Sequence, residues 1–204
     1  KPVNMGTTDG LAVCYAKGND VIINKTNGQT IYKSDDGGTN WTTITTGIST
    51  VSRGIGFTFG DVNNGWFLRD FIYLGKTTNG GASWSSFSTG YSYRYSIYAY
   101  DSSNCWLMCD SGVYSTTDGS TWNQKLSSNY TCGWFTSATE GFVAGWNKKL
   151  HYTNNGGTNW QTVNNTLDSS DAIFGLMSLD GNYLWIQDSG SHIHRSADRG
   201  TTWT

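Results

Sequence analysis

Ser34-Asp35-Asp36-Gly37-Gly38-Thr39-Asn40-Trp41 is an eight-residue stretch that returns, with changes, four more times along the chain. Each copy, called a box below, has a hydroxyl residue first, an Asp, Asn or Thr third, a glycine fifth and a tryptophan eighth. A unit of about forty residues that repeats over a whole chain is typical of propellers and related arrays. The sequence gives five boxes: Ser34–Trp41, Thr77–Trp84, Ser115–Trp122, Thr153–Trp160 and Ser196–Trp203.

The residue types of the box predict a tight turn. A hydroxyl in first place and a side-chain oxygen in third place can both accept hydrogen bonds from nearby backbone N–H groups. Glycine in fifth place tolerates a positive φ, which a Cβ would oppose. The tryptophan begins the next extended run, and its large ring suits a slot between packed sheets. We therefore expect the boxes to be structural turns.

The residues between the boxes predict four short strands in each unit. After Trp41, turn residues separate four extended segments, which are Thr42–Thr46, Ile55–Phe59, Gly65–Arg69 and Ile72–Lys76. Four short strands per repeat form one blade of a propeller. No segment has the 3.6-residue apolar period of a helix, so the fold class is all-β. The prediction is one domain, residues 1–204, folded as a five-bladed β-propeller of four-stranded antiparallel blades.

The two ends of the chain predict how the ring closes. The sequence stops at Thr204, directly after the fifth box, where every other unit continues into a fourth strand. Residues 1–5 stand before the first inner strand, so we expect this N-terminal strand to complete the last blade and close the ring. Pro2 is compatible with an edge strand.

Composition excludes several classes of protein. The formal net charge is −2 and only 14 % of residues are charged, which opposes nucleic-acid binding. No apolar run reaches the length of a membrane span, so no membrane insertion is expected. A Cys109–Cys132 disulfide is conceivable, but buried free thiols are the simpler expectation. Nothing in the sequence indicates a cofactor.

The boxes resemble the Asp-box, or BNR, repeat of sialidases, of other glycoside hydrolases, of sortilin-type receptors and of photosystem assembly factors of the Ycf48 type. The resemblance covers all five units and is specific to the architecture, not to an activity. It implies that the boxes connect third and fourth strands, on the side opposite the ligand. Sialidases have six blades and plant-type assembly factors seven, whereas this sequence has five units.

That implication places the ligand on the loops between second and third strands and on the connections between blades. Aromatic rings there can stack on a sugar, and carboxylates can accept its hydroxyl donors. The alternative is that tyrosine and aspartate are simply frequent in turns and on β-surfaces. The candidate ligand-binding residues are Arg53, Arg69, Asp70, Tyr91, Tyr93, Arg94, Asp110, Tyr130, Trp146 and Asp188.

Catalytic and metal sites find less support in the sequence. The family resemblance implies a Tyr–Glu pair for sialidase chemistry, but Glu140, the only glutamate, falls in a first-to-second-strand loop on the box side. His192 and His194 share one side of a strand and could bind zinc with at least one further ligand. An ordinary packed strand position explains the two histidines more simply. We therefore expect no catalytic residues and no metal.

The sequence thus predicts a non-catalytic binding module that recognises a glycan or a polar protein surface. The low charge and the abundance of Ser, Thr, Asn and aromatic residues resemble adhesion modules, which favours an extracellular or virion-surface location. An alternative is a scaffold or assembly factor that docks a polypeptide. A third possibility is a glycoside hydrolase that uses Asp70 with Asp110 or Asp188.

Overall fold

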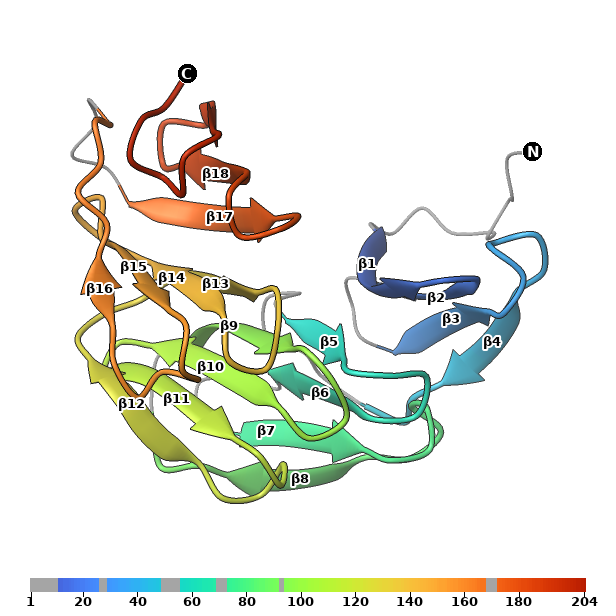
Figure 1. The fold of residues 1–204 in the computed structure, drawn as a ribbon. Coiled ribbons are helices and arrows are strands. Elements are labelled where there is room, and N and C mark those ends of the chain that lie inside the picture. Colours follow the sequence, from blue (N-terminus) through green and yellow to red (C-terminus); the bar gives the residue numbers. More distant parts are fainter. Residues whose placement is uncertain (1–10, 26–28, 49–55, 69–72, 92–93, 168–171) are drawn as a thin grey trace.

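A computed structural model describes residues 11–25, 29–48, 56–68, 73–91, 94–167 and 172–204. In these ranges the chain forms five antiparallel sheets, which follow one another around a common centre (Figure 1). This arrangement confirms the predicted all-β, five-bladed propeller. The described residues contain no helix that is long and apolar enough to cross a membrane.

The strands succeed one another in each sheet, from an inner strand to an outer one. The first two sheets contain β1 (Leu11–Lys17), β2 (Asp20–Lys25), β3 (Thr30–Ser34) and β4 (Thr42–Thr45), then β5 (Phe57–Phe59), β6 (Gly65–Leu68), β7 (Tyr73–Thr77) and β8 (Ser85–Ser88). The next two contain β9 (Arg94–Ala99), β10 (Cys105–Cys109), β11 (Gly112–Thr116) and β12 (Asn123–Ser127), then β13 (Cys132–Phe135), β14 (Gly141–Ala144), β15 (Leu150–Thr153) and β16 (Gln161–Thr162). The fifth contains β17 (Ile173–Ser178), β18 (Leu184–Asp188) and β19 (Ile193–Ser196).

The fifth sheet has three strands in the described residues and the first hydrogen bonds of a fourth. Thr204 and Arg195 exchange two backbone bonds, of 2.8 and 2.9 Å. In the first sheet Thr42 pairs with Lys33 in the same way, directly after the box tryptophan. Thr204 therefore occupies the starting position of an outer strand. The prediction that residues 1–5 complete this strand lies outside the described residues.

The first box forms the turn that its residue types predict. Ser34 Oγ accepts a bond from the N–H of Gly38 at 2.8 Å and donates one to Asp36 Oδ1 at 2.8 Å. Asp36 in turn accepts the N–H groups of Thr39 and Asn40, at 2.9 and 2.8 Å. Gly38 has a φ of +89°, as a turn of this kind requires. The box joins β3 to β4, so it connects the third and fourth strands as expected.

The third box begins one residue later than the sequence spacing predicts. Thr116, not Ser115, supplies the hydroxyl, which accepts the N–H of Gly119 at 2.8 Å and donates to Asp118 at 2.9 Å. The predicted third-place residue, Thr117, therefore has no capping role here. Asp118 lies directly before the glycine and accepts the N–H of Thr121 at 2.7 Å, so the same turn is closed over a shorter loop.

The box tryptophans stabilise the contact between neighbouring sheets. Trp84 packs with Ile22, Ile31 and Ile44 of the preceding sheet, in a cluster that also holds Phe59 of its own sheet. Trp122, Trp160 and Trp203 pack in the same way into the next three inter-sheet clusters. This agrees with the predicted slot between packed sheets, and it makes these four boxes part of the hydrophobic core.

The three cysteines whose side chains the structure describes are buried free thiols. Cys105, Cys109 and Cys132 form no disulfide, as the simpler expectation had it. Burial raises the pKa of the Cys132 thiol to about 12, so it stays protonated and unreactive.

Four of the five boxes donate a backbone hydrogen bond to the turn between the first and second strands of their own sheet, and in the last of them Arg199 donates to Asn182 at 3.0 Å. Gly37 donates its N–H to the carbonyl of Asn19 at 2.9 Å, and Gly80 donates to Asn63 at 2.8 Å. Gly156 donates in the same way to Thr139 at 2.8 Å. The boxes and these turns therefore lie at one end of the strands, called the box rim below. The turns between second and third strands, with the connections between sheets, form the opposite end, called the loop rim.

Candidate binding site

The structure describes six of the ten candidate residues at least in part. Arg94 belongs to β9, although only its backbone is described. The side chains that can be placed are those of Tyr91, Asp110, Tyr130, Trp146 and Asp188. The remaining candidates lie outside the described residues: Arg53, Arg69, Asp70 and Tyr93.

Asp110 and Trp146 lie in one connected group on the loop rim. Asp110, in the turn between β10 and β11, accepts the hydroxyl of Tyr95 at 2.6 Å and the amide of Asn129 at 2.9 Å, both on Oδ1. The side chain of Trp146 also lies close to the Tyr95 hydroxyl and lowers its pKa slightly, against the larger effects of burial and Asp110. Phe174 of β17 meets the ring of Trp146 edge to face, with the ring centroids 5.6 Å apart.

These five residues are called the loop-rim patch. The patch joins three successive sheets, because Tyr95 and Asp110 belong to the third, Trp146 to the fourth and Phe174 to the fifth. Both rings are open to solvent, with 41 % of Trp146 and 46 % of Phe174 exposed. An exposed aromatic pair beside a fixed carboxylate is a common composition for a recognition surface.

A tight hairpin turn holds Trp146 in place. Asn147 and Lys148 have φ values of +57° and +56°, the left-handed pair of a type I′ turn. Gly145 donates its N–H to the carbonyl of Lys149 at 3.0 Å, and Lys149 donates to Trp146 at 3.3 Å. A two-residue turn between β14 and β15 leaves the tryptophan little freedom, so the ring is presented by a rigid element.

The polar part of the patch contains one unsatisfied acceptor. Asn129 Oδ1 is buried and has no hydrogen-bond partner among the described residues. Its amide nitrogen is committed to Asp110, which fixes the oxygen as the unpaired atom. Burial and the bond to Asp110 raise the pKa of Tyr95, so its hydroxyl stays a neutral donor. A ligand N–H or O–H could complete the bonding of Asn129.

Tyr130 and Tyr91 belong to the packing between sheets. Tyr130 is 2 % exposed, and its hydroxyl lies 3.5 Å from His151 Nδ1. Tyr91 stacks on Tyr114 with ring centroids 3.7 Å apart and is half-buried in the cluster around Trp66. Neither ring is part of the exposed patch.

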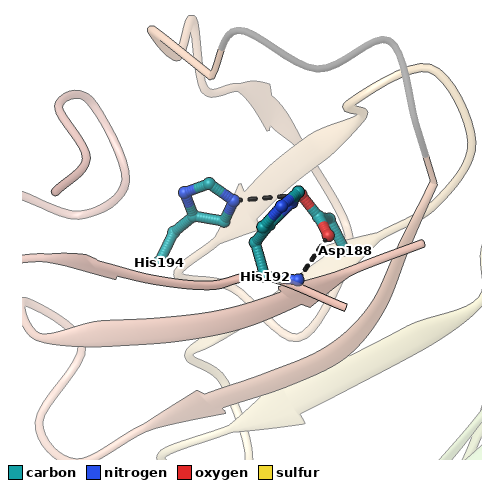
Figure 2. Close-up of side chains that lie close together, drawn as sticks. All are labelled: Asp188, His192 and His194. Carbon is teal, nitrogen blue, oxygen red and sulfur yellow. Dashed lines mark hydrogen bonds and ion pairs between the residues drawn. The ribbon is translucent and has the colours of Figure 1, made fainter. Parts of the chain in front are cut away.

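Asp188 lies in a separate cluster on the same rim (Figure 2). Its carboxylate is only 5 % exposed, and Oδ2 lies 3.1 Å from His192 Nδ1 and 3.0 Å from His194 Nε2. Hydrogen bonds from His194 and from the backbone and ring of His192 hold the pKa of Asp188 well below its usual range. The sequence pattern supplied the two histidines, and the structure adds Asp188 as a third donor beside them.

A Tyr–Glu pair is present, but it lies on the box rim. The hydroxyl of Tyr152 donates to Glu140 Oε1 at 2.7 Å, and the guanidinium of Arg199 lies 5.4 Å from the Tyr152 ring centroid. The bond from Gly156 to Thr139, next to Glu140, confirms that this glutamate is on the box side. Burial and the bond to Glu140 raise the pKa of Tyr152, which opposes formation of a nucleophilic phenolate.

Two cavities lie away from the loop-rim patch. One, of about 500 Å³, lies among the inner strands β1, β5 and β9 and extends to Trp134. The other, of about 450 Å³, lies between the first sheet and Val62, and its lining includes Lys33 and Trp41. Burial lowers the pKa of Lys33, whose amine donates to the Val62 carbonyl. That amine thus bridges two sheets.

Sequence reasoning missed Tyr95, Asn129 and Phe174. Tyr95 and Phe174 lie near the loop-rim ends of inner strands. The sequence has no turn residues at these strand ends, so it did not indicate that the two rings lie on the loop rim. The alternation of side chains along a strand could have identified Phe174, because it follows the buried Ile173 and must face away from the core of its sheet. Asn129 could have been found as a polar residue in the connection that follows β12.

Comparison with known proteins supports the fold and leaves the activity open. No family model and no curated protein matches the sequence. The structure is similar to YCF48 from Cyanidioschyzon merolae, with a TM-score of 0.69 and 12 % identity over 97 % of this chain and 72 % of that one. It is also similar to the structure of YCF48 bound to D1 peptide, with a TM-score of 0.50 and 17 % identity over 99 % and 82 %.

An enzyme is among the similar structures as well. The GH74 enzyme of Niastella koreensis matches with a TM-score of 0.67 and 16 % identity, over 96 % of this chain but only 37 % of the enzyme. Identities this low show a shared fold alone, because one fold hosts many functions. The comparisons therefore show a β-propeller, and the function has to be argued from the residues of this chain.

Proposed function

We propose that the chain is a non-catalytic docking scaffold that binds an extended segment of a partner polypeptide across the loop-rim patch. The observation that carries the proposal is the patch itself. Two exposed rings, Trp146 and Phe174, lie beside a carboxylate that Tyr95 holds in place. Aromatic residues in fixed positions are the usual anchors of protein–protein recognition.

A polypeptide can bind both the aromatic part and the polar part of the loop-rim patch. An apolar side chain can pack against the edge-to-face rings of Trp146 and Phe174. A backbone or side-chain N–H can donate to the unpaired Asn129 Oδ1. Asp110 adds a fixed negative charge, which favours a basic or amide-bearing residue next to the apolar anchor.

One of the similar structures supports the class of partner. It is described as YCF48 bound to D1 peptide, so a protein with this fold holds a peptide. At 17 % identity the likeness transfers no contact residue to this chain. The choice of the loop rim comes from Trp146 and Phe174.

The placed carboxylates favour binding over hydrolysis. Glycosidases need one carboxylic acid with a raised pKa across the scissile bond from a second carboxylate. The pKa of Asp188 is shifted in the opposite direction, because two histidines stabilise its charged form. Oδ1 of Asp110 already accepts bonds from Tyr95 and Asn129.

A glycan is the second candidate ligand, favoured by one observation. The exposed ring of Trp146 stands beside a hydrogen-bonding carboxylate, and a sugar can stack its C–H face on such a ring while its hydroxyls donate to the acid. An extracellular or virion-surface location would suit this reading. The edge-to-face angle of 84° between Trp146 and Phe174 gives no flat two-ring platform, so we place the polypeptide first.

Selection from a random peptide library, followed by titration of the selected peptide, tests the proposal. Trp146→Ala and Phe174→Ala should each raise Kd roughly thirtyfold, the effect of losing an interface anchor worth about 2 kcal/mol. Tyr100→Ala is the matched control, because Tyr100 is 40 % exposed but follows β9 at the box rim. Its Kd should equal that of the unmodified protein.

The outcomes of three measurements separate the candidate functions. Peptide binding that survives both patch variants, or that Tyr100→Ala weakens equally, would refute the proposed surface. A glycan array signal that disappears in Trp146→Ala, with no peptide selected, would favour the sugar instead. Turnover of a fluorogenic glycoside that is lost in Asp110→Asn would overturn the non-catalytic assignment.

A further inference from the structure

We infer that Asp188, His192 and His194 form a binding site for a divalent transition-metal ion, with Zn²⁺ as the ion to test first. This inference goes beyond the proposed docking function and does not depend on it. Within the described residues, these three form the one group of His, Cys, Asp or Glu donors close enough to share a metal. Their ligand atoms all lie within 4.8 Å of one another.

The distances suit a small ion after a slight outward movement of the donors. The two imidazole nitrogens lie 3.0 and 3.1 Å from the same carboxylate oxygen, Asp188 Oδ2. In a tetrahedral zinc site with bonds of about 2.0–2.2 Å, neighbouring ligand atoms are roughly 3.3–3.5 Å apart. Each of the two contacts with the carboxylate therefore needs to lengthen by only a few tenths of an ångström, and the two imidazole nitrogens lie within 4.8 Å of each other. Figure 2 shows both histidines beside Asp188.

The hairpin between β18 and β19 holds the donors in position. Asp188 donates its N–H to the His192 carbonyl at 3.1 Å, and the His192 N–H donates back to Asp188 Oδ1 at 2.9 Å. This leaves Oδ2 as the oxygen that faces both rings. A buried carboxylate with one oxygen fixed by the backbone is a preorganised ligand.

Gly190 leaves the space that His192 needs. A Cβ at position 190 would lie 2.8 Å from both Cε1 and Nδ1 of the His192 ring, and 3.2 Å from Asp188 Oδ1. Any other residue there would push the ring away from the carboxylate. The absence of a side chain at this position is therefore part of the geometry that brings the three donors together.

The donor set also selects the class of ion. Two imidazoles and one carboxylate suit Zn²⁺ and its first-row neighbours, whereas Mg²⁺ and Ca²⁺ prefer oxygen ligands alone. The side chain of His192 is 70 % exposed, so one side of the site is open to water or to a donor from a partner. Three protein ligands with an open position are the arrangement of an accessible metal site.

Calorimetric titration of the tag-free, EDTA-treated chain with ZnCl₂ tests the inference. We expect one ion per chain, and at least about a tenfold loss of affinity in His192→Ala and in His194→Ala. His151→Ala is the matched control. That histidine is the only other one in the chain and hydrogen-bonds Tyr130 and Thr162 instead. MgCl₂ and CaCl₂ should give no comparable binding.

Two further variants distinguish the loss of a metal ligand from a loss of folding. Asp188→Asn removes a buried charge, so its melting temperature is measured before its affinity is interpreted. Gly190→Ala keeps all three donors and should still weaken Zn²⁺ by displacing the His192 ring. Absence of stoichiometric binding, unchanged affinity in His192→Ala and His194→Ala, or an equal loss in His151→Ala would each overturn the site.

Discussion

The two rims of this propeller differ in which residues adopt a left-handed backbone conformation. On the box rim the left-handed positions are almost all glycine, as in Gly38, Gly81, Gly157 and Gly200, and Arg199 is the described exception. On the loop rim four residues with side chains also adopt a positive φ, beside four glycines. The residues with side chains are Ser128, Asn147, Lys148 and Ser191, and the glycines are Gly47, Gly56, Gly90 and Gly112. Strain held by residues other than glycine gathers at functional sites more often than at purely structural turns.

Hydrogen bonding shows the same contrast. On the box rim a repeated hydroxyl and a repeated Asp or Asn satisfy the N–H groups of each turn from within the box. On the loop rim the turns differ from sheet to sheet, and Asn129 retains a buried acceptor without a partner among the described residues, whereas the unpaired buried groups of the boxes are the indole donors of Trp122 and Trp160. The repeated boxes therefore identify the fold, and the loops that differ from sheet to sheet identify the surface available for a function.

The largest expected effect compares one tryptophan from each rim. Trp84 meets Phe67 and Phe57 edge to face, at 4.9 and 5.6 Å, and donates to the Gly81 carbonyl at 3.0 Å. Trp84→Ala should lower the free energy of unfolding by about 3 kcal/mol or more, since it leaves a cavity between two sheets. Trp146→Ala should cost less than about 1 kcal/mol, because its ring is exposed. Urea unfolding of both variants gives the comparison, and similar losses would contradict the assignment of the two rims.

The boxes also predict a loss of stability in acid. Hydrogen bonds from Asn40, Ser34 and Thr39 lower the pKa of Asp36 to about 2, and bonds from Thr202, Ser196 and Thr201 lower the pKa of Asp198 to about 2. Because the folded pKa is depressed, each carboxylate stabilises the fold above the unfolded pKa of about 4. That contribution is lost as the pH falls from about 4 through 2.

Two boxes of the same chain provide the natural control for this prediction. Asn79 and Asn155 hold the position of Asp36 and accept the backbone N–H of the residue four positions later, as Asp36 does from Asn40, without a titrating group. The double variant Asp36→Asn, Asp198→Asn should therefore fold with the same turns and show a smaller decline in unfolding free energy between pH 4 and 2. Urea unfolding at intervals of one pH unit measures the slope. An unchanged slope would mean that other carboxylates account for the acid sensitivity.

The sequence predicted the architecture because the architecture repeats. The positions of the five box tryptophans determined the number of sheets, and the hydroxyl–Asp pattern determined the turns. The third box was placed one residue early, because Ser115 and Thr116 both carry hydroxyls and only the closed turn shows which one caps Gly119. A regular spacing cannot reveal a loop that is shortened in one copy.

The sites were less predictable because they depend on contacts between different units. The patch joins Tyr95 to Trp146 and Phe174 across three sheets, and no local pattern links these residues. The candidate metal site had a local signal in the sequence, which a comparison between the repeats does not reveal. Asp188, His192 and His194 face the same side of one hairpin, since Asp188 pairs with His192 across the turn and His194 follows two residues later.

The smallest effect tests the strain on the loop rim directly. Lys148 has a φ of +56° in the turn that presents Trp146, a conformation that costs a residue with a Cβ about 1 kcal/mol. Lys148→Gly relieves that cost, but it also removes the amine that donates to the Leu167 carbonyl and loosens the unfolded chain. Lys148→Ala loses the same amine and keeps the Cβ, so the difference in stability between the two variants isolates the contribution of the backbone.

Thermal unfolding should show the glycine variant to be the more stable by up to about 1 kcal/mol. An alanine variant of equal or greater stability would show that the turn carries no strain of this kind, and the contrast between the rims would then rest on hydrogen bonding alone.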